Sequence, residues 1–497
     1  MCRGIGPSAP GFGVRHGARA WGRAHEMSTG GEGALYAKRI PIHPRSVRGR
    51  FRRLKHAVLA LAYGVYFLLP WLRWERPAGP DQAVLFDLPA RRFYVFGLVV
   101  HPDDIFWLAG VLVAAALLLF FVTSLAGRVF CGYFCFQTLW TDVYQLIERL
   151  VQGERAARLR LEAQPWDAEK IRKKGLTHLL WLAVAFATGL TFTLYWADAP
   201  QLARGFFTGA APFPAYATAA FLTATTYVMA GIAREQVCTY MCPYARFQGV
   251  MFDRDTLIVA YDRARGEGRK GRHRPVRGLR TRAERHAAGH GDCVDCGYCV
   301  QVCPTGIDIR DGLQYQCITC ALCIDACDTV MDRLGWPRGL IRYTSENALA
   351  GRPTRLLRPK VLGYGGAFFL SVALLAWSVA ARAPLEVTVI QQRQPLYVIL
   401  SDGRVQNGYE VKLVNKTERT LELAVRLAAP AGAELDLGRI RTVRLAPERM
   451  VRVLARVRQR PEAAARTVRF RVEERAGRVP AVEHEAPFFV PQAAGGG

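Results

Sequence analysis

Two runs of four cysteines lie back to back between residues 293 and 327, and they constrain the fold more than any other feature of the sequence. Each run has the spacing C-x-x-C-x-x-C-x-x-x-C, and the runs comprise Cys293, Cys296, Cys299 and Cys303, then Cys317, Cys320, Cys323 and Cys327. Tight x-x turns let three thiolates of one run bind three irons of one cubane cluster, and where two clusters are bound the fourth ligand comes from the other run. The spacing therefore predicts two 4Fe-4S clusters, one held by Cys293, Cys296, Cys299 and Cys327, the other by Cys317, Cys320, Cys323 and Cys303.

Two other interpretations of these runs remain open. A zinc site or disulfides would also use cysteines, although zinc favours two separated C-x-x-C pairs over runs of four. Pro304 follows the first run, as the cluster pattern expects, whereas Asp328 follows the second. The difference is a minor departure from the pattern. Unequal clusters, with a 3Fe-4S centre in place of one 4Fe-4S cluster, are the second alternative.

Five stretches of the sequence are long and apolar enough to span a bilayer, which takes roughly 20 residues. They cover residues 54–72, 105–126, 176–196, 215–233 and 361–380. The fourth stretch is rich in Ala and Thr and also fits a helix buried in a protein core. A chain of 497 residues with such stretches is expected to hold several modules, a membrane domain among them.

The placement of basic residues separates membrane association from nucleic-acid binding. The formal net charge is +26, and 51% of the residues are hydrophobic. Lys and Arg crowd the segments before the first apolar stretch, between the second and third, and between the fourth and fifth, whereas 73–104 and 197–214 contain far fewer. The positive-inside bias predicts that the N-terminus and the cysteine runs are cytoplasmic and that the C-terminal region lies across the membrane. Because the basic excess fits contact with lipid headgroups, we expect no binding of nucleic acid.

A second pair of cysteine motifs lies at the cytoplasmic ends of the second and fourth apolar stretches. Cys131 and Cys135 form one C-x-x-x-C motif, and Cys238 and Cys242 form the other, with Met241 beside them. On a helix, positions i and i+4 share a face, so each pair offers two thiols to one soft ion, and thiolate and thioether ligands select Cu(I). Thiol redox chemistry, or a role as small buried hydrophobes, also fits each pair. If the two helix ends are adjacent, all four thiols converge.

The short external segment 81–104 ends on a polar group formed by His101, Asp103 and Asp104. These side chains fit either a metal or proton-relay site or, more commonly, an exposed turn that caps the following helix. We expect the capping role.

Residues 385–493 differ in character from the rest of the chain. Apolar and polar residues alternate there at the period of a β-strand, and Gly, Pro and Asn separate the alternating segments. Several short strands at this spacing predict an immunoglobulin-like β-sandwich. The segment has neither cysteines nor a recognisable catalytic group, which favours a scaffold or docking role.

The sequence therefore predicts a multidomain α+β membrane protein with five transmembrane helices, a cytoplasmic two-cluster ferredoxin-like insert and a C-terminal immunoglobulin-like β-sandwich. The expected modules are a disordered extension at 1–34, a basic arm with four transmembrane helices at 35–253, a basic linker at 254–292, the two-cluster domain at 293–340, a connector with the fifth transmembrane helix at 341–384, and a periplasmic domain at 385–493. Met27 would serve as a start codon as well as Met1.

Four long motifs resemble one family, the FixG/CcoG/RdxA-type cytochrome c oxidase accessory proteins. They are GRVFCGYFCFQTLWTD, QVCTYMCPYARFQGVMFDRDTLIVAYD, the double cysteine run and DTVMDRLGWPRGLIRYTSEN, and the resemblance extends from residue 35 onward. One position departs from the family pattern, because Phe136 stands where C-x-x-x-C-P would have proline. The departure puts the turn after Cys135 in doubt but keeps both thiols.

The resemblance implies a cupric reductase of the bacterial inner membrane that converts Cu(II) to Cu(I) for assembly of cbb3-type oxidase. Cys131, Cys135, Cys238 and Cys242 would then bind copper, and copper delivery proteins and oxidase assembly factors would be partners. The sequence identifies neither the electron donor nor the oligomeric state, and a homodimer is one expectation. Two alternatives stay open: a quinol- or flavin-linked electron-transfer subunit, since the motifs also resemble NapH-type proteins, and a non-catalytic assembly scaffold.

Overall fold

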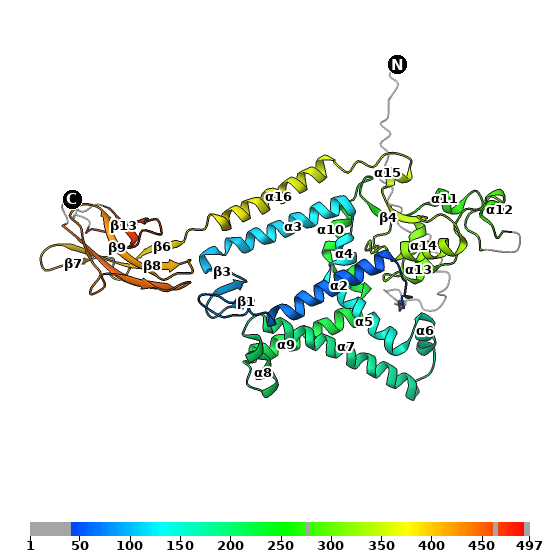
Figure 1. Cartoon of the computed structure of the whole chain (residues 1–497), viewed down its shortest axis with the longest axis horizontal. Coiled ribbons are helices and arrows are strands. Elements are labelled where there is room, and N and C mark those ends of the chain that lie inside the picture. Colours follow the sequence, from blue (N-terminus) through cyan, green and yellow to red (C-terminus); the bar gives the residue numbers. More distant parts are fainter. Residues whose placement is uncertain (1–40, 275–278, 461–465, 492–497) are drawn as a thin grey trace, which may run out of the picture. The chain divides into compact units, whose positions relative to one another are not determined.

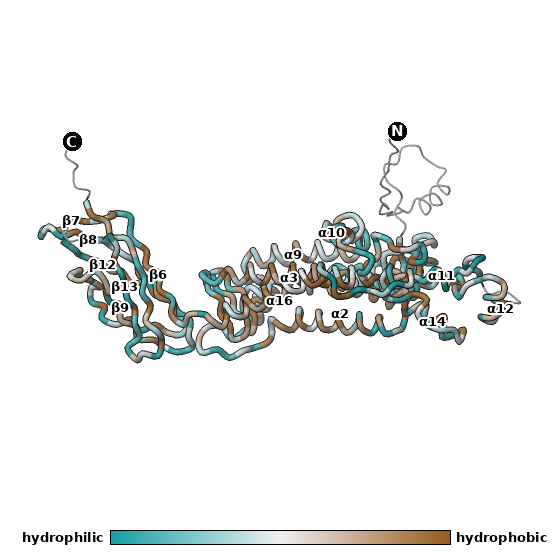
Figure 2. Tube along the Cα trace, turned by 90° about the horizontal axis from the view of Figure 1, so that it is seen from above, coloured by the Kyte–Doolittle hydropathy of each residue, from teal (hydrophilic) through white to brown (hydrophobic). Residues whose placement is uncertain are grey.

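The structure, a computed structural model, describes residues 41–274, 279–460 and 466–491 (Figure 1). The extension predicted at 1–34 lies outside these residues. Among the described residues, five helices are long and apolar enough to cross a membrane: Arg50–Trp71, Pro102–Ala126, Ala168–Leu194, Phe213–Ala233 and Pro359–Ala380. They match the five apolar stretches of the sequence, and Figure 2 shows hydrophobic residues along the spans that it labels.

These spans are built from helices α2 (Arg50–Leu68) with η1 (Leu69–Trp71), η2 (Pro102–Asp104) with α3 (Phe106–Ala126), α7 (Ala168–Leu194), α9 (Phe213–Thr226) with the π-helix η3 (Tyr227–Ala233), and α16 (Pro359–Ala380). Helices α3 and α16 lie side by side, as do α7 and α9 (Figure 1). Glycines permit the close approach, because a Cβ at Gly189 of α7 would lie 2.5 Å from the carbonyl oxygen of Ala219 in α9. A Cβ at Gly365 of α16 would likewise lie 2.9 Å from the ring of Phe121 in α3.

Shorter helices connect the spans and carry the two C-x-x-x-C motifs. They are α4 (Val129–Tyr133), α5 (Phe136–Gln152), α6 (Arg155–Ala163), α8 (Ala199–Thr208), the π-helix η4 (Val237–Met241) and α10 (Pro243–Met251). The amphipathic α5 buries Tyr144 against Trp181 of α7, and the two rings stack 5.2 Å apart. This contact fixes the direction in which α5 leaves the first motif.

The cluster module holds β4 (Ile258–Tyr261), α11 (Arg263–Glu267), α12 (Arg282–Ala287), α13 (Tyr298–Gln301), η5 (Ile309–Asp311), α14 (Leu322–Leu334), β5 (Ile341–Thr344) and α15 (Glu346–Leu349). Strand β4 pairs antiparallel with β5. The segment 254–292, predicted as a linker, thus contains a strand and two helices that belong to this module, and the module extends beyond residue 340. The sequence pattern did not predict this pairing, because two strands of four residues, about 80 positions apart, give no local signal that they form a ladder.

The module is attached to the first span through Asp325 of α14. Its carboxylate accepts hydrogen bonds from the backbone amides of Phe51 (3.3 Å) and Arg52 (2.8 Å), in the first turn of α2. These amides have no intrahelical partner, so a carboxylate stabilises the helix start. Gly49 gives the carboxylate room, because a Cβ there would lie 2.2 Å from Cγ of Asp325.

The C-terminal region forms two antiparallel sheets. One has the order β10-β12-β8-β6 with β7 paired to β8, and the other has the order β11-β9-β13-β14. The strands are β6 (Leu385–Gln391), β7 (Val398–Ile399), β8 (Val405–Asn415), β9 (Leu421–Ala429), β10 (Glu434–Asp436), β11 (Val443–Leu445), β12 (Met450–Gln459), β13 (Thr467–Glu474) and β14 (Val482–Pro487). Alternate residues of β8, such as Tyr409, Val411 and Leu413, are fully buried, as the strand period predicts.

A three-stranded meander of β1 (Val84–Asp87), β2 (Arg92–Val95) and β3 (Leu98–Val100) precedes the second span. His101 is the N-cap residue of η2, as expected, but it is buried rather than exposed. Its Nε2 lies 2.7 Å from Oε2 of Glu448. Asp104 binds Lys416 (2.7 Å) and Arg382 (3.1 Å), so these polar side chains join the span to the β-sandwich.

Candidate metal centres

The eight cysteines of the two runs line two cavities of the cluster module. One cavity is lined by Cys293, Cys296, Cys299 and Cys327. The other is lined by Cys303, Cys317, Cys320 and Cys323, with Cys299 at its edge. Each cavity therefore gathers three cysteines of one run and the last cysteine of the other, the arrangement that the spacing predicts for two cubane clusters.

The chemistry of these cavities fits iron–sulfur clusters. Apart from the thiols the walls are mostly apolar, with residues such as Val294, Leu340 and Ile341 in the first and Val259 and Ile309 in the second. Burial raises the pKa of the Cys299 and Cys317 thiols to about 12, so neither would ionise alone at neutral pH. Bound iron supplies the positive charge that holds such thiols as thiolates.

The two runs adopt the same strained backbone at equivalent positions. Asp295 and Thr319 have φ of 45° and 56°, and Gly297 and Ala321 have φ of 65° and 60°. Three of these four residues are not glycine, and the left-handed region costs such residues energy. Positive φ at the residues on either side of the second cysteine turns three thiols of a run toward one cavity.

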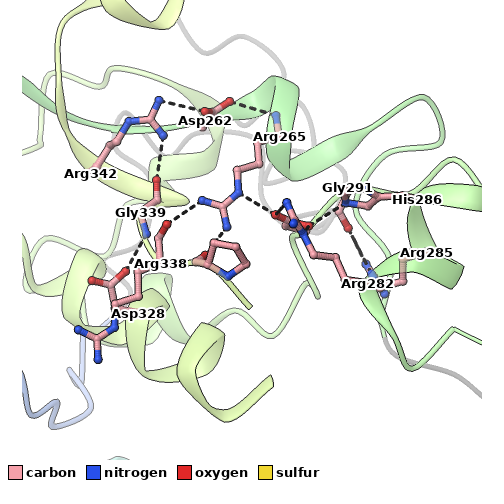
Figure 3. Close-up of polar contacts among 12 residues, drawn as sticks. Asp262, Arg265, Arg282, Arg285, His286, Gly291, Asp328, Arg338, Gly339 and Arg342 are labelled. Carbon is pink, nitrogen blue, oxygen red and sulfur yellow. Dashed lines mark hydrogen bonds and ion pairs between the residues drawn. The ribbon is translucent and has the colours of Figure 1, made fainter. Parts of the chain in front are cut away.

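Cationic side chains gather at the start of the first run (Figure 3). Asp292 is fully buried beside Cys293 and accepts hydrogen bonds from Arg265 (2.7 Å), Arg282 (2.9 Å) and His286 (2.9 Å). Burial acts to raise the pKa of Asp292, but the hydrogen bonds from Arg282, Arg265 and His286 outweigh it and lower the pKa to about 2. This network holds the chain in place where it enters the first cavity.

Arg285 adds a buried positive charge at the same place. Its side chain is fully buried, lies over the ring of Trp336, and donates to the carbonyl oxygens of Gly291 and Cys293. Its guanidinium has no carboxylate as a hydrogen-bond partner among the residues that the structure describes. The cation therefore lies next to the first cysteine cavity, held by backbone carbonyl oxygens and with the carboxylate of Asp292 nearby.

Each C-x-x-x-C motif spans a break between two helices. Cys131 lies in α4 and Cys135 is the N-cap residue of α5, whereas Cys238 lies in η4 and Cys242 is the N-cap residue of α10. The expectation that both thiols of a motif share one face of a continuous helix is therefore wrong in its geometry. The second cysteine of each motif has an extended backbone that ends one helix and begins the next.

Phe136 does not disturb the first of these turns. Pro243 disfavours a helical backbone at the residue before it, and Cys242 accordingly has φ −82° and ψ 109°. Cys135 adopts φ −64° and ψ 126° without a following proline. The second cysteines of the two motifs thus share an extended backbone conformation, which settles the doubt about the turn after Cys135.

The four motif thiols lie close enough to influence one another electrostatically. Burial, followed by the negative charges of Cys135 and Cys131, raises the pKa of Cys238 to about 12. The Cys131 thiol donates to Oε1 of Gln248 at 3.0 Å. Within the described residues, however, no three His, Cys, Asp or Glu side chains are set to hold a single metal ion. Met241 is 57% exposed, whereas Cys131 is buried and the other three motif cysteines are partly buried.

Helix α4 packs directly on the loop of the second cysteine run. Cys131, Ile318 and Cys320 belong to one buried hydrophobic cluster, and the hydroxyl of Tyr133 donates to the carbonyl oxygen of Cys320 at 3.1 Å. A Cβ at Gly132 would lie 2.7 Å from the carbonyl oxygen of Ile318 and 2.9 Å from Cα of Cys320. The first motif and the second cavity therefore share a wall.

The sequence analysis missed Gly132 and Tyr133, and it missed Gln248. The signal for Gly132 was present, because a glycine inside a helical motif often marks a close backbone approach. Nothing in the spacing indicates that Gln248 of α10 reaches Cys131, since that contact depends on how the second and fourth spans pack.

A cavity opens beside Cys238, at the ends of the spans. Its lining includes Lys55, Asp142, Arg234 and Ile318 of the second run. Asp142 is buried and paired with Arg52 (2.9 Å) and Lys55 (3.7 Å). The cavity gives the motif cysteines a polar neighbourhood that also touches the cluster module.

Comparison with known proteins identifies two iron–sulfur domains and the C-terminal domain. A family model for the 4Fe-4S dicluster domain matches residues 233–346, one for a 4Fe-4S binding domain matches 106–152, and one for the Ig-like fold at the C-terminal of FixG matches 375–491. The last match confirms the predicted immunoglobulin-like domain. The first match includes both cysteine runs together with Cys238 and Cys242, and the second includes Cys131 and Cys135.

Three relatives match most of the chain. The nitrogen fixation protein FixG of Rhizobium meliloti is 43% identical over 430 residues, which cover 79% of this chain and 80% of FixG. RdxB and RdxA of Cereibacter sphaeroides are each 46% identical, over 81% and 79% of this chain and over 85% and 83% of their own lengths.

Proposed function

We propose a function from one premise: this chain belongs to the FixG/RdxA family. It has two 4Fe-4S binding domains and five helices able to cross a membrane, which are the parts of a membrane-bound electron-transfer protein. We propose that the electron acceptor is Cu(II), and that the chain is a cupric reductase of the bacterial inner membrane. On this proposal the cysteine runs face the cytoplasm and the β-sandwich faces the periplasm, as the positive-inside bias favours.

The observation that carries the proposal is the shared wall between Cys131 and Cys320. When bound, the clusters would supply the single electron that converts Cu(II), the substrate, into Cu(I). The first C-x-x-x-C motif touches the loop of the second cysteine run, so the proposed copper site would be in contact with the proposed electron source. Electron transfer from the cluster to copper needs this proximity, whereas two functionally unrelated thiol sites would have no need to lie in contact.

The motif cysteines would bind the product rather than the substrate. Thiolates are soft ligands that favour Cu(I) over harder divalent ions. Cys131, Cys135, Cys238 and Cys242 would therefore stabilise copper after its reduction. Since no three of these thiols are set to hold one ion, we propose that two of them bind Cu(I) at a time. An open site of this kind suits release to a copper delivery protein during assembly of cbb3-type oxidase.

Cu(I) binding by Cys242→Ser tests the role of the motif cysteines. The variant should bind Cu(I) more weakly in competition with a chromogenic chelator, while the absorption and EPR spectra of the clusters stay unchanged. Met241→Leu is the matched control, because this thioether is more exposed than the motif thiols and its loss should leave Cu(I) binding intact. Wild-type Cu(I) affinity in Cys242→Ser would contradict the proposal, and loss of the clusters would show that the sites are not separate.

A second candidate function is oxidation of a membrane quinol, and the polar cavity beside Cys238 favours it. A quinol must bind close to the clusters that it reduces, and this cavity is lined by both Cys238 and Ile318 of the second cysteine run. A quinol that reduces the clusters in the absence of copper would favour this function. Normal oxidase maturation after substitution of all four motif cysteines would instead favour a non-catalytic scaffold.

A further inference from the structure

A basic groove opens beside the first cysteine cavity. It lies between the segment before α2, the start of α6 and helices α13 and α14. Its charged and aromatic lining consists of Arg45, Arg48, Glu154, Arg155, Tyr298 and Arg333. Four guanidinium groups thus face one carboxylate.

The single carboxylate is already engaged within the protein. Glu154 accepts hydrogen bonds from the hydroxyl of Ser46 at 2.7 Å and from its backbone amide at 3.4 Å. The side chains of Arg48, Arg155 and Arg333 make no hydrogen bond or ion pair with any other residue in the described ranges. The groove therefore presents positive charge that the described part of the chain leaves unmatched.

The arginines of the cluster module outside the groove behave differently. Arg310 binds both Asp308 and Asp295 at 2.6 Å, and Arg282 binds Asp292. These two arginines are paired with carboxylates, and the buried Arg285 donates to backbone carbonyl oxygens, so each of the three has partners within the protein. The unpaired state of the groove arginines is the feature that points to an external anionic partner.

The groove is separated from the first cysteine cavity by one side chain. Tyr298 lies between Cys296 and Cys299 in the sequence and lines both the groove and the cavity. Cys296 is exposed, and Arg333 follows Cys327 on helix α14. A partner bound in the groove would therefore lie against the loop that carries three of the four cysteines of that cavity.

We infer that this groove docks an acidic one-electron carrier, a small iron–sulfur or flavin protein with carboxylates around its redox centre, and that this carrier is the electron donor. One electron leaves the reduced centre of the carrier, which is thereby oxidised, and enters this protein beside Tyr298. No atom or proton is transferred. A nicotinamide dinucleotide fits less well, because it delivers two electrons as a hydride, which cysteine-bound iron does not accept.

The inference deepens the proposed function by naming the donor, and it rests on that function for the direction of electron flow. Docking needs no copper, so the two proposals fail separately. A protein that docks the carrier but leaves Cu(II) unreduced would contradict the proposed function alone. A protein that reduces Cu(II) from chemically reduced clusters but docks no carrier would contradict this inference alone.

The test measures binding of an acidic plant-type 2Fe-2S ferredoxin and of a flavodoxin to the full-length holoprotein in detergent. The wild-type protein should bind at least one of these probes, with an affinity that falls as salt rises from low to physiological concentration. Arg48→Glu combined with Arg333→Glu should weaken binding about tenfold or more, because reversal replaces attraction with repulsion at two points. Arg393→Glu with Arg419→Glu, the same change of charge on the β-sandwich, is the control and should leave binding unchanged.

A second readout follows the rate at which the reduced probe reduces the clusters, measured by absorbance without copper. The groove variant should be reduced more slowly by the probe but normally by photochemical reduction, which shows that its clusters are intact. Failure of both probes to bind, or equal binding by the groove variant and the control, would overturn the inference. The inference would also be overturned if the groove variant bound the probes normally and lost only its binding to phosphatidylglycerol vesicles. The groove would then be a lipid-headgroup site.

Discussion

Replacing Gly132 by alanine tests the contact between the first C-x-x-x-C motif and the second cysteine run. The added Cβ would lie 2.7 Å from the carbonyl oxygen of Ile318 and 2.9 Å from Cα of Cys320. Both are backbone atoms of the loop that bears Cys317 and Cys320, so no flexible side chain can move aside. Overpacking of this kind costs about 1–3 kcal/mol, or a roughly 5- to 150-fold shift toward a displaced loop.

The assay compares thermal unfolding and EPR spectra of the anaerobically reconstituted protein in one detergent and at one scan rate. Gly132→Ala should unfold at a lower temperature and lose or alter the EPR signal of the cluster at Cys303, Cys317, Cys320 and Cys323, while the other cluster is retained. Gly175→Ala in α7 is the matched control, because nothing lies within 4 Å of the added Cβ and alanine favours a helix interior by about 0.5–1 kcal/mol. Equal unfolding temperatures and two unchanged signals in Gly132→Ala would refute the shared wall.

Three other perturbations follow from the structure. Arg285→Met should lower the reduction potential of the cluster beside Cys293 in an EPR-monitored titration, because reduction adds negative charge near this buried cation. Arg285→Lys keeps the charge and should largely preserve the potential. An unchanged potential in Arg285→Met would contradict this role. Asp325→Ala should cost about 1–2 kcal/mol and lower the unfolding temperature because two amides of α2 lose their acceptor, and Asp325→Asn should lose less. Burial lowers the pKa of His43 below its usual value near 6.5, and the charges of Arg158 and Arg234 add to this shift while those of Glu148 and Glu162 oppose it. The stability that the neutral side chain of His43 contributes is therefore complete above pH 6.5 and is lost as the pH falls below that value. The unfolding temperature of His43→Phe should therefore fall less between pH 7.5 and pH 5.5 than that of the wild type.

The sequence predicts those parts of the structure that depend on local spacing. Hydrophobic length alone locates the five spans, and alternation along β8 and β12 identifies the β-sandwich, because one face of each strand is buried. The cysteine spacing likewise predicts which thiols line each cavity, since C-x-x-C turns admit few geometries. These features need no knowledge of how distant segments pack.

The parts that the sequence did not predict depend on contacts between distant segments. The start of the segment 254–292 has a strand-like pattern, but nothing local shows that this strand, β4, pairs with β5. The meander of β1 to β3 also depends on pairing between short strands. The helix break at Cys135 has no proline to announce it, although the same break at Cys242 does. The wall between Gly132 and Ile318 arises from the packing of the second span on a loop almost 190 residues away.

The most direct test of the proposed cupric reductase is an anaerobic single turnover. The clusters of the purified protein are reduced, excess reductant is removed, and Cu(II) is added while cluster absorbance and a Cu(I)-specific chelator are followed together. The proposal predicts that Cu(I) forms in step with cluster reoxidation, one ion for each electron released. Clusters that stay reduced while copper remains Cu(II) would contradict it.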